Sequence, residues 1–125
     1  MAVAGLVGGT YYLSLKPAPS PPIMQLHLLL KKFKNAYEKE DLQALQTIST
    51  MTPERLRNVE FMFANYQSVK VSIEEVVVSD EEASALMILN ELIQNNGEHV
   101  KLSKIGSTIK LKIGSVGTEW GKIAW

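Results

Sequence analysis

Two side chains have the type and setting for acid–base chemistry. Tyr37 lies on a predicted helix and could offer its hydroxyl to a cavity, while Glu91 shares one face of a predicted strand with Met87 and Leu89. A carboxylate on an apolar inner face would have a raised pKa and could act as a base. Each residue also has a structural interpretation: Tyr37 as a half-buried aromatic with a wet hydroxyl, and Glu91 as a carboxylate at an open rim beyond the core.

Other chemistries lack their signatures. His27 and His99 are far apart, and neither has the short His or Glu spacing of a metal site. The adjacent carboxylates at 74–75 and 80–82 cannot share one cavity, because neighbouring strand residues point to opposite faces. No glycine pattern resembles a phosphate loop, and no serine sits in a nucleophile elbow. We therefore predict no catalytic residues, no metal site and no cofactor.

Composition narrows the class of partner. The chain has 125 residues, 46% of them apolar, which is enough for one domain to bury a core without disulfides or metal. Lysine plus arginine and aspartate plus glutamate number 13 each, so no net charge would steer the protein onto nucleic acid. There is no cysteine, so the sequence does not indicate a redox compartment.

The first 22 residues differ from the rest. Residues 1–15 carry no charge and include a glycine-rich apolar run, but they are too few to span a bilayer, which needs about 20 apolar residues. We interpret them as an apolar tail and the remnant of a membrane anchor, which would leave the folded domain outside the bilayer; a packed or flexible tail is the alternative. Residues 16–22 contain four prolines and form a linker, so the domain is predicted to cover residues 23–125.

Helical periodicity fills the first part of this domain. One apolar stripe runs through residues 23–40, and a shorter one follows from Leu42 to Ile48. Asp41 is placed to cap the second helix. Thr52 and Pro53 then mark the start of a third helix that ends near Ala64.

The period changes from helical to two after Tyr66. A first strand shifts phase near Glu74, which predicts a bulge, and residues 83–94 form a strand that is apolar on both faces. Asn95-Asn96-Gly97 predicts a tight turn. Further strands are expected at residues 99–113 and 119–125. The order of elements predicts an α+β domain in which N-terminal helices pack on a curved, mainly antiparallel four-stranded sheet.

The order of elements and several residues resemble the nuclear transport factor 2-like superfamily, a cone-shaped α+β fold shared by ketosteroid isomerase, scytalone dehydratase and polyketide cyclases. The resemblance covers residues 24–125 and rests on the helix junction at 36–45 (AYEKEDLQAL), the Gly97 turn and residues 120–123 (WGKI). At the junction this chain has Glu40 where the family has glycine. The closing motif is one residue longer than the family's, which predicts a bulge at Gly121 or a shifted register.

The resemblance implies a fold more strongly than an activity. Isomerase-like members place an acidic tyrosine two turns before the junction aspartate, and the matching residue here is Phe33, which has no ionisable group. We therefore predict a non-catalytic interaction or accessory domain. A pocket for a small apolar ligand, lined by Tyr37, Glu91 and Trp120, is the first alternative, and an isomerase, dehydratase or cyclase is the second.

Self-association is predicted from the strand at residues 83–94. Leu86, Ile88 and Leu92 continue the apolar pattern on the face opposite Ala85 and Met87. If helices cover one face, the other is left as an apolar patch unless something docks there. We predict that Leu86, Ile88 and Leu92 form a homodimer interface about a two-fold axis.

Overall fold

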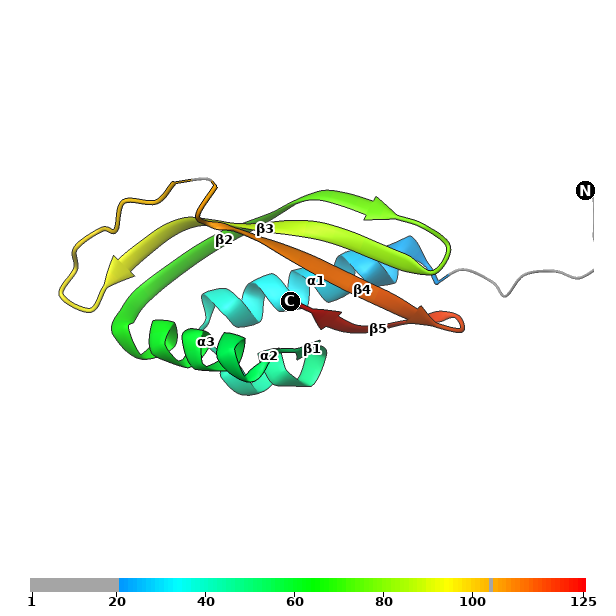
Figure 1. Ribbon diagram of the computed structural model, residues 1–125, viewed down its shortest axis with the longest axis horizontal. Helices are drawn as coiled ribbons and strands as arrows, with labels where there is room; N and C mark the ends of the chain where they lie inside the picture. Colours follow the sequence, from blue (N-terminus) through cyan, green and yellow to red (C-terminus); the bar gives the residue numbers. More distant parts are fainter. Residues whose placement is uncertain (1–20, 104) are drawn as a thin grey trace, which may run out of the picture.

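The computed structural model describes residues 21–103 and 105–125 of the chain, and Figure 1 shows their arrangement. The elements in chain order are α1 (Ile23–Glu38), α2 (Leu42–Ile48), β1 (Ser49–Thr50), α3 (Pro53–Asn65), β2 (Tyr66–Val78), β3 (Glu82–Gln94), β4 (Thr108–Val116) and β5 (Glu119–Ala124). The predicted α+β architecture is confirmed. The proposed anchor at residues 1–15 and the first part of the linker lie outside the described residues.

Side chains that bond to the backbone define the starts of α2 and α3. The Asp41 carboxylate accepts from the Ala44 N–H at 3.1 Å, and the Thr52 hydroxyl accepts from the Arg55 N–H at 3.1 Å. Pro53 occupies the first position of α3, where a missing N–H has no cost. Both predicted helix starts are confirmed.

The end of α1 is a Schellman motif with glutamate in the glycine position. The Asp41 N–H donates to the Ala36 carbonyl at 2.9 Å and the Glu40 N–H to the Tyr37 carbonyl at 3.1 Å. Glu40 has a φ of 56°, in the left-handed region that glycine adopts most easily. The turn expected of this fold is therefore kept, although its usual residue is absent.

The sheet has five strands in the order β1-β5-β4-β3-β2, one more than predicted. The extra strand is β1, which follows directly after α2. Ser49 and Thr50 pair in parallel with Ile123 and Ala124 of β5. The prediction missed β1 because two residues carry no recognisable alternation, and their pairing depends on a strand more than 70 positions away.

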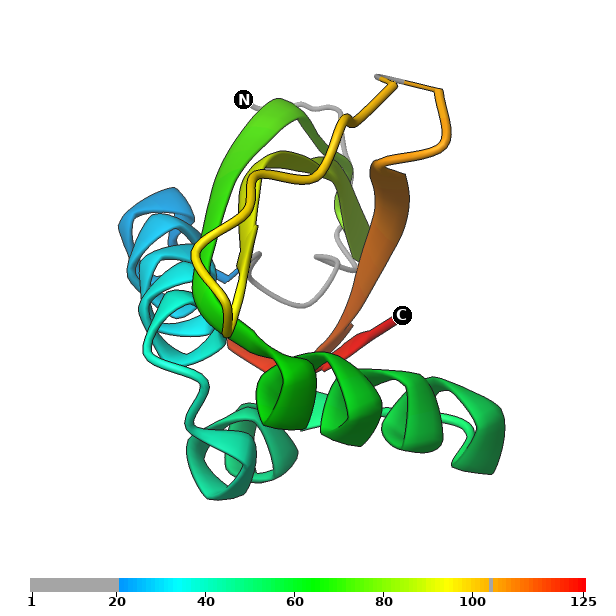
Figure 2. The same cartoon turned by 90° about the vertical axis from the view of Figure 1, so that its left-hand side faces the viewer.

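The sheet follows an open curve (Figure 2), and register shifts interrupt its strand pairing, three of them at Glu75, Asn90 and Gly121. Glu75 has a φ of 53° and forms the predicted bulge in β2. In β3, Leu89 pairs with Val71 and Glu91 with Lys70, so that Asn90 is an extra residue. In β5 the register shifts at Gly121, as the longer closing motif predicted.

The strand predicted at residues 99–113 begins later than expected. His99 forms one isolated bridge with Ile93, and regular pairing starts only at Thr108 of β4. Between them, the Val100 N–H reaches the Leu92 carbonyl and the Ser107 carbonyl accepts from the Leu89 N–H, both near the edge of β3. The sequence prediction was wrong here, because apolar alternation does not reveal where a segment leaves its partner strand.

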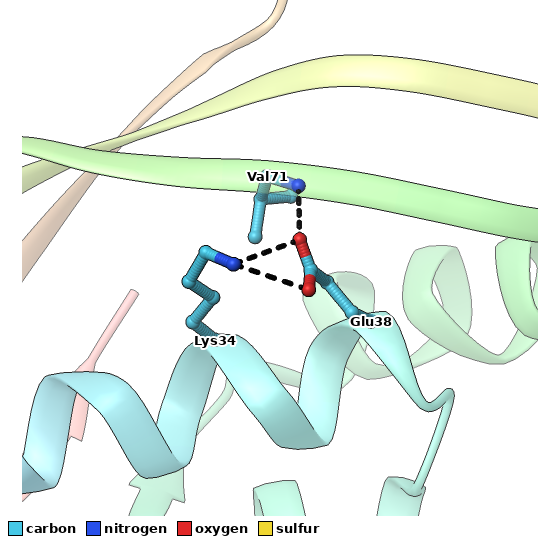
Figure 3. Close-up of polar contacts among 3 residues, drawn as sticks. All are labelled: Lys34, Glu38 and Val71. Carbon is cyan, nitrogen blue, oxygen red and sulfur yellow. Dashed lines mark hydrogen bonds and ion pairs between the residues drawn. The ribbon is translucent and has the colours of Figure 1, made fainter.

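Helix α1 closes the open side of the curved sheet. Its buried stripe includes Leu26, Leu30 and Phe33, and these pack into the core that the inner face of the sheet provides. The carboxylate of Glu38 accepts the Val71 N–H at 2.9 Å on the edge strand β2 and also receives Lys34 at 3.2 Å (Figure 3). An exposed strand edge invites unwanted pairing, so this contact also protects the sheet.

Candidate functional site

Four aromatic rings pack against one another in the interior of the domain. Phe33 and Trp125 pack edge to face with ring centroids 5.0 Å apart, and Tyr37 contacts both Phe63 and Trp125 at 5.6 Å. These separations are typical of favourable aromatic pairs. The rings come from α1, α3 and the residue after β5, so three distant segments meet in this cluster.

Tyr37 is completely enclosed, with 1% of its surface exposed. Its hydroxyl donates to the Met62 sulfur at 3.3 Å, a weak acceptor. Burial raises the pKa of Tyr37 to about 12, and the Arg55 charge only partly opposes this. The hydroxyl therefore holds its proton near neutral pH and faces a thioether, so the expected wet hydroxyl is wrong.

Trp125 is the residue of this cluster that sequence reasoning missed. The Arg55 guanidinium lies 5.3 Å from its ring centroid, within range of a cation–π contact. Its indole N–H is buried and has no hydrogen-bond partner among the described residues. The signal that could have found it is the alternation of Ile123, Ala124 and Trp125, which puts the tryptophan on the inner face.

Glu91 lies outside this cluster. The bulge at Asn90 reverses the phase of β3, so Glu91 pairs with exposed Lys70 and leaves the face of Met87 and Leu89. Its carboxylate is 3.9 Å from His99 Nδ1, and 39% of its side chain is exposed. The inner-face setting that would make Glu91 a base is therefore absent from this structure.

Trp120 lies in a third place, beside the start of α1. Its indole N–H donates to the Pro22 carbonyl at 3.0 Å, and its ring lines a groove of about 650 Å³ with Leu28, Leu29 and Ile48. The three residues predicted to line one ligand pocket are therefore distributed over the interior, the outer face of β3 and this groove.

The bulge at Asn90 also changes the predicted dimer face. Leu92 pairs with Val69 and joins the core, so it lies on the inner face and not beside Leu86 and Ile88. Ile88 points outward but is only 5% exposed, next to Leu102 and Ser103. Of the three residues predicted to form the dimer interface, Leu86 remains on the outer face and is partly exposed. It lies between Glu74 on β2 and Lys110 on β4.

Within residues 21–103 and 105–125, no three histidine, aspartate or glutamate side chains gather as a metal site would require. No helix in this part of the chain is both long enough and apolar enough to cross a membrane.

Comparison with solved structures identifies the architecture. A putative dehydratase of the nuclear transport factor 2-like family from Streptomyces avermitilis superimposes with a TM-score of 0.59 at 15% identity, covering 82% of this chain and 91% of that one. The chain has the nuclear transport factor 2-like fold. This confirms the fold inferred from the helix junction and the closing strand.

Other neighbours share the fold. A putative aromatic ring hydroxylase from Novosphingobium aromaticivorans matches with a TM-score of 0.59 at 12% identity, over 82% of this chain and 88% of that one. A conserved protein from Planctomyces limnophilus matches with a TM-score of 0.58 at 16% identity, over 82% and 93%. No family model and no curated protein matches the sequence. At these identities the likeness establishes the nuclear transport factor 2-like fold alone.

Proposed function

We propose that this nuclear transport factor 2-like domain is a non-catalytic interaction module that associates with a second copy of itself. The observation that carries the proposal is the packing of the four aromatic rings in the interior. An isomerase, dehydratase or cyclase would need at least two polar groups converging on an open cavity. Here Tyr37 is packed against Phe63, Trp125 and the Met62 sulfur, and Glu91 is on another face.

The same packing argues against the two alternative functions. An apolar ligand would have to displace the rings that stabilise α1 and α3 against the sheet. An isomerase or dehydratase would need a proton donor, and the Tyr37 hydroxyl has its pKa raised to about 12 by burial. Tyr37→Phe and Glu91→Gln should therefore change stability without abolishing any activity. A substrate whose turnover fell about a hundredfold on either change, the scale of general acid–base catalysis, would refute this.

The outer face of the sheet supports self-association. Across one row, Glu74 of β2, Leu86 of β3 and Lys110 of β4 lie side by side. A two-fold axis through the apolar centre would bring the acidic side of one copy onto the basic side of the other. In such a dimer the apolar centres of the two copies would meet, and each acidic side chain would face a basic one.

Sedimentation equilibrium tests the dimer. The wild-type chain should be dimeric at micromolar concentration, and Leu86→Glu should weaken the dimer at least about tenfold, or 1.4 kcal/mol, because two unpaired charges would be buried near the axis. Leu86 is preferred to Ile88, since a charge at the buried Ile88 would disrupt the fold itself. Phe61→Glu on α3, where the ring is 64% exposed, is the matched control and should leave the dimer intact.

A charge exchange makes the test specific to this face. Lys110→Glu alone should weaken association, and Glu74→Lys added to it should restore association, because the pairing across the axis would be reversed but complementary. A wild-type protein that remains monomeric at high micromolar concentration would refute self-association. A dimer indifferent to Leu86→Glu would refute this interface.

A further inference from the structure

Three segments of the chain meet at one end of the domain: the start of α1, the turn between β2 and β3, and the turn between β4 and β5 (Figure 1). Hydrogen bonds join them. The Trp120 indole N–H donates to the Pro22 carbonyl at 3.0 Å, and the Ser115 N–H donates to the Glu81 carbonyl at 3.0 Å. Ser115 also pairs with Trp120 across the two last strands. We call this region the entry end, and it comprises residues 21–24, 77–82 and 115–120.

Exposed apolar side chains are concentrated at the entry end. In the part of the chain that the structure describes, eight large apolar residues are exposed, and five of them lie there: Ile23, Met24, Val77, Val78 and Val116. Met24 and Val116 are each 75% exposed. Single exposed apolar residues are ordinary on a protein surface, but several at one place indicate an interaction surface.

The chain enters the domain at this same end. Pro21 is the first residue that the structure describes, and residues 1–15 of the sequence contain no charged side chain. Residues 16–21 separate that apolar tail from Pro22 and can span no more than about 21 Å. A tail held in a bilayer would therefore keep the entry end close to the lipid surface, at a high effective concentration. This favours a membrane over another protein as the partner of the exposed side chains.

The charge of the entry end selects the kind of lipid. Asp80, Glu81 and Glu82 lie at the turn between β2 and β3, Glu119 begins β5, and all four are exposed. The entry end contains no lysine or arginine. An anionic lipid surface would repel these carboxylates, whereas zwitterionic head groups carry no net charge.

We propose that the entry end contacts the surface of a zwitterionic lipid bilayer, with Met24 and Val116 inserted at the level of the head groups. Apolar side chains of peripheral elements reach about 5–10 Å into this region. The contact rests on the apolar tail being held in the bilayer, because so few side chains bind weakly without it. It does not depend on self-association, since Leu86 and the outer face of the sheet stay clear of the lipid. Its consequence is a fixed orientation, with the entry end toward the membrane.

The full chain in phosphatidylcholine nanodiscs tests this orientation. A gadolinium chelate on some of the lipid head groups broadens the amide signals of residues near the surface. The Met24 and Val116 signals should be lost. Those of Phe61 and Asn95 should remain, because the Asn95 N–H bonds to the Asn65 carbonyl at the end of α3, and β3 separates that place from the entry end by about 40 Å. Equal broadening at both ends, or a chain that does not associate with the discs, would overturn the proposal.

Two variants and a change of lipid complete the experiment. Met24→Gln combined with Val116→Gln should make the broadening equal at both ends, and both positions are exposed enough to keep the fold. Phe61→Gln, an equally exposed position away from the lipid, is the matched control and should leave the difference between the ends unchanged. Phosphatidylglycerol in place of part of the phosphatidylcholine should reduce the difference, and added salt should restore it. A difference that survives the paired substitution, or that phosphatidylglycerol enlarges, would overturn the proposal.

Discussion

Glu40, like Glu75, has a positive φ that residues other than glycine rarely adopt. Its φ of 56° costs an L-residue about 1–2 kcal/mol relative to the right-handed region. Burial also raises the pKa of its carboxyl group, and Oε2 has no hydrogen-bond partner among the residues that the structure describes. Both penalties act on the folded state alone, so removing the side chain should stabilise the protein.

Glu40→Gly should raise the free energy of unfolding by about 1 kcal/mol, because glycine adopts the left-handed conformation without strain. Urea denaturation at pH 7 measures the change. Lys39→Gly is the matched control: Lys39 has a φ of −84°, so glycine there should destabilise the helix end. Equal effects of the two glycine substitutions would contradict this account of the junction.

Glu38 joins α1 to the edge of the sheet through its carboxylate. Burial alone would raise its pKa, but the Val71 N–H and Lys34 together hold the pKa below its ordinary value of 4.5. A group with a lowered folded pKa contributes stability that is present above the ordinary value and is lost as the pH falls through the folded value. Protonation of Glu38 at low pH should therefore contribute to acid unfolding.

Glu38→Gln should lower stability by about 1 kcal/mol at pH 7, because a charge-assisted hydrogen bond becomes a neutral one. The loss of stability below pH 4.5 should also become shallower. Lys34→Gln leaves the Val71 contact in place and should cost less, since that ion pair is partly solvated. An acid unfolding profile that Glu38→Gln leaves unchanged would disprove the linkage.

At the scale of elements, Tyr37 joins α1 to α3 through Met62 and Phe63. Its pKa is raised from 10.0 to about 12, so the stability linked to this group is present below pH 10 and is lost as the pH rises toward 12. Ionisation would place a phenolate among aromatic rings.

Tyr37→Phe should change stability at pH 8 by no more than about 1 kcal/mol, because it removes only one weak hydrogen bond to sulfur. Between pH 10 and 12 the variant should lose less stability than the wild type. Chemical denaturation followed by tryptophan fluorescence at pH 8 and 11 gives both quantities. Parallel alkaline losses in the two proteins would show that Tyr37 is not buried as described.

The helix starts, which local chemistry defines, could be predicted from the sequence, whereas β1 and the bulge in β3, which depend on strand pairing, could not. Asp41 and Thr52 mark helix starts because each side chain bonds to its own turn. The bulge at Asn90 leaves no such mark, and it moves Glu91 outward and Leu92 inward. One unpredictable residue in β3 therefore accounts for the errors in both the candidate base and the dimer face.

At the scale of the whole molecule, the folded domain should not require its first 20 residues. A chain starting at Pro21 keeps the Pro22 contact with Trp120 and should unfold in one cooperative transition. The full chain should partition into a detergent phase and the shorter one should remain in the aqueous phase. Loss of folding on truncation would make the apolar tail part of the core, and equal partitioning would refute the anchor.

We infer that the aromatic rings fill the interior, and xenon binding tests this inference most directly. Xenon occupies dry apolar cavities large enough to hold it, so it reports empty space that an apolar ligand could use. A crystal of the protein pressurised with xenon should contain no xenon atom among Phe33, Tyr37, Phe63 and Trp125. A xenon atom enclosed by those four rings would show an open pocket and contradict the account.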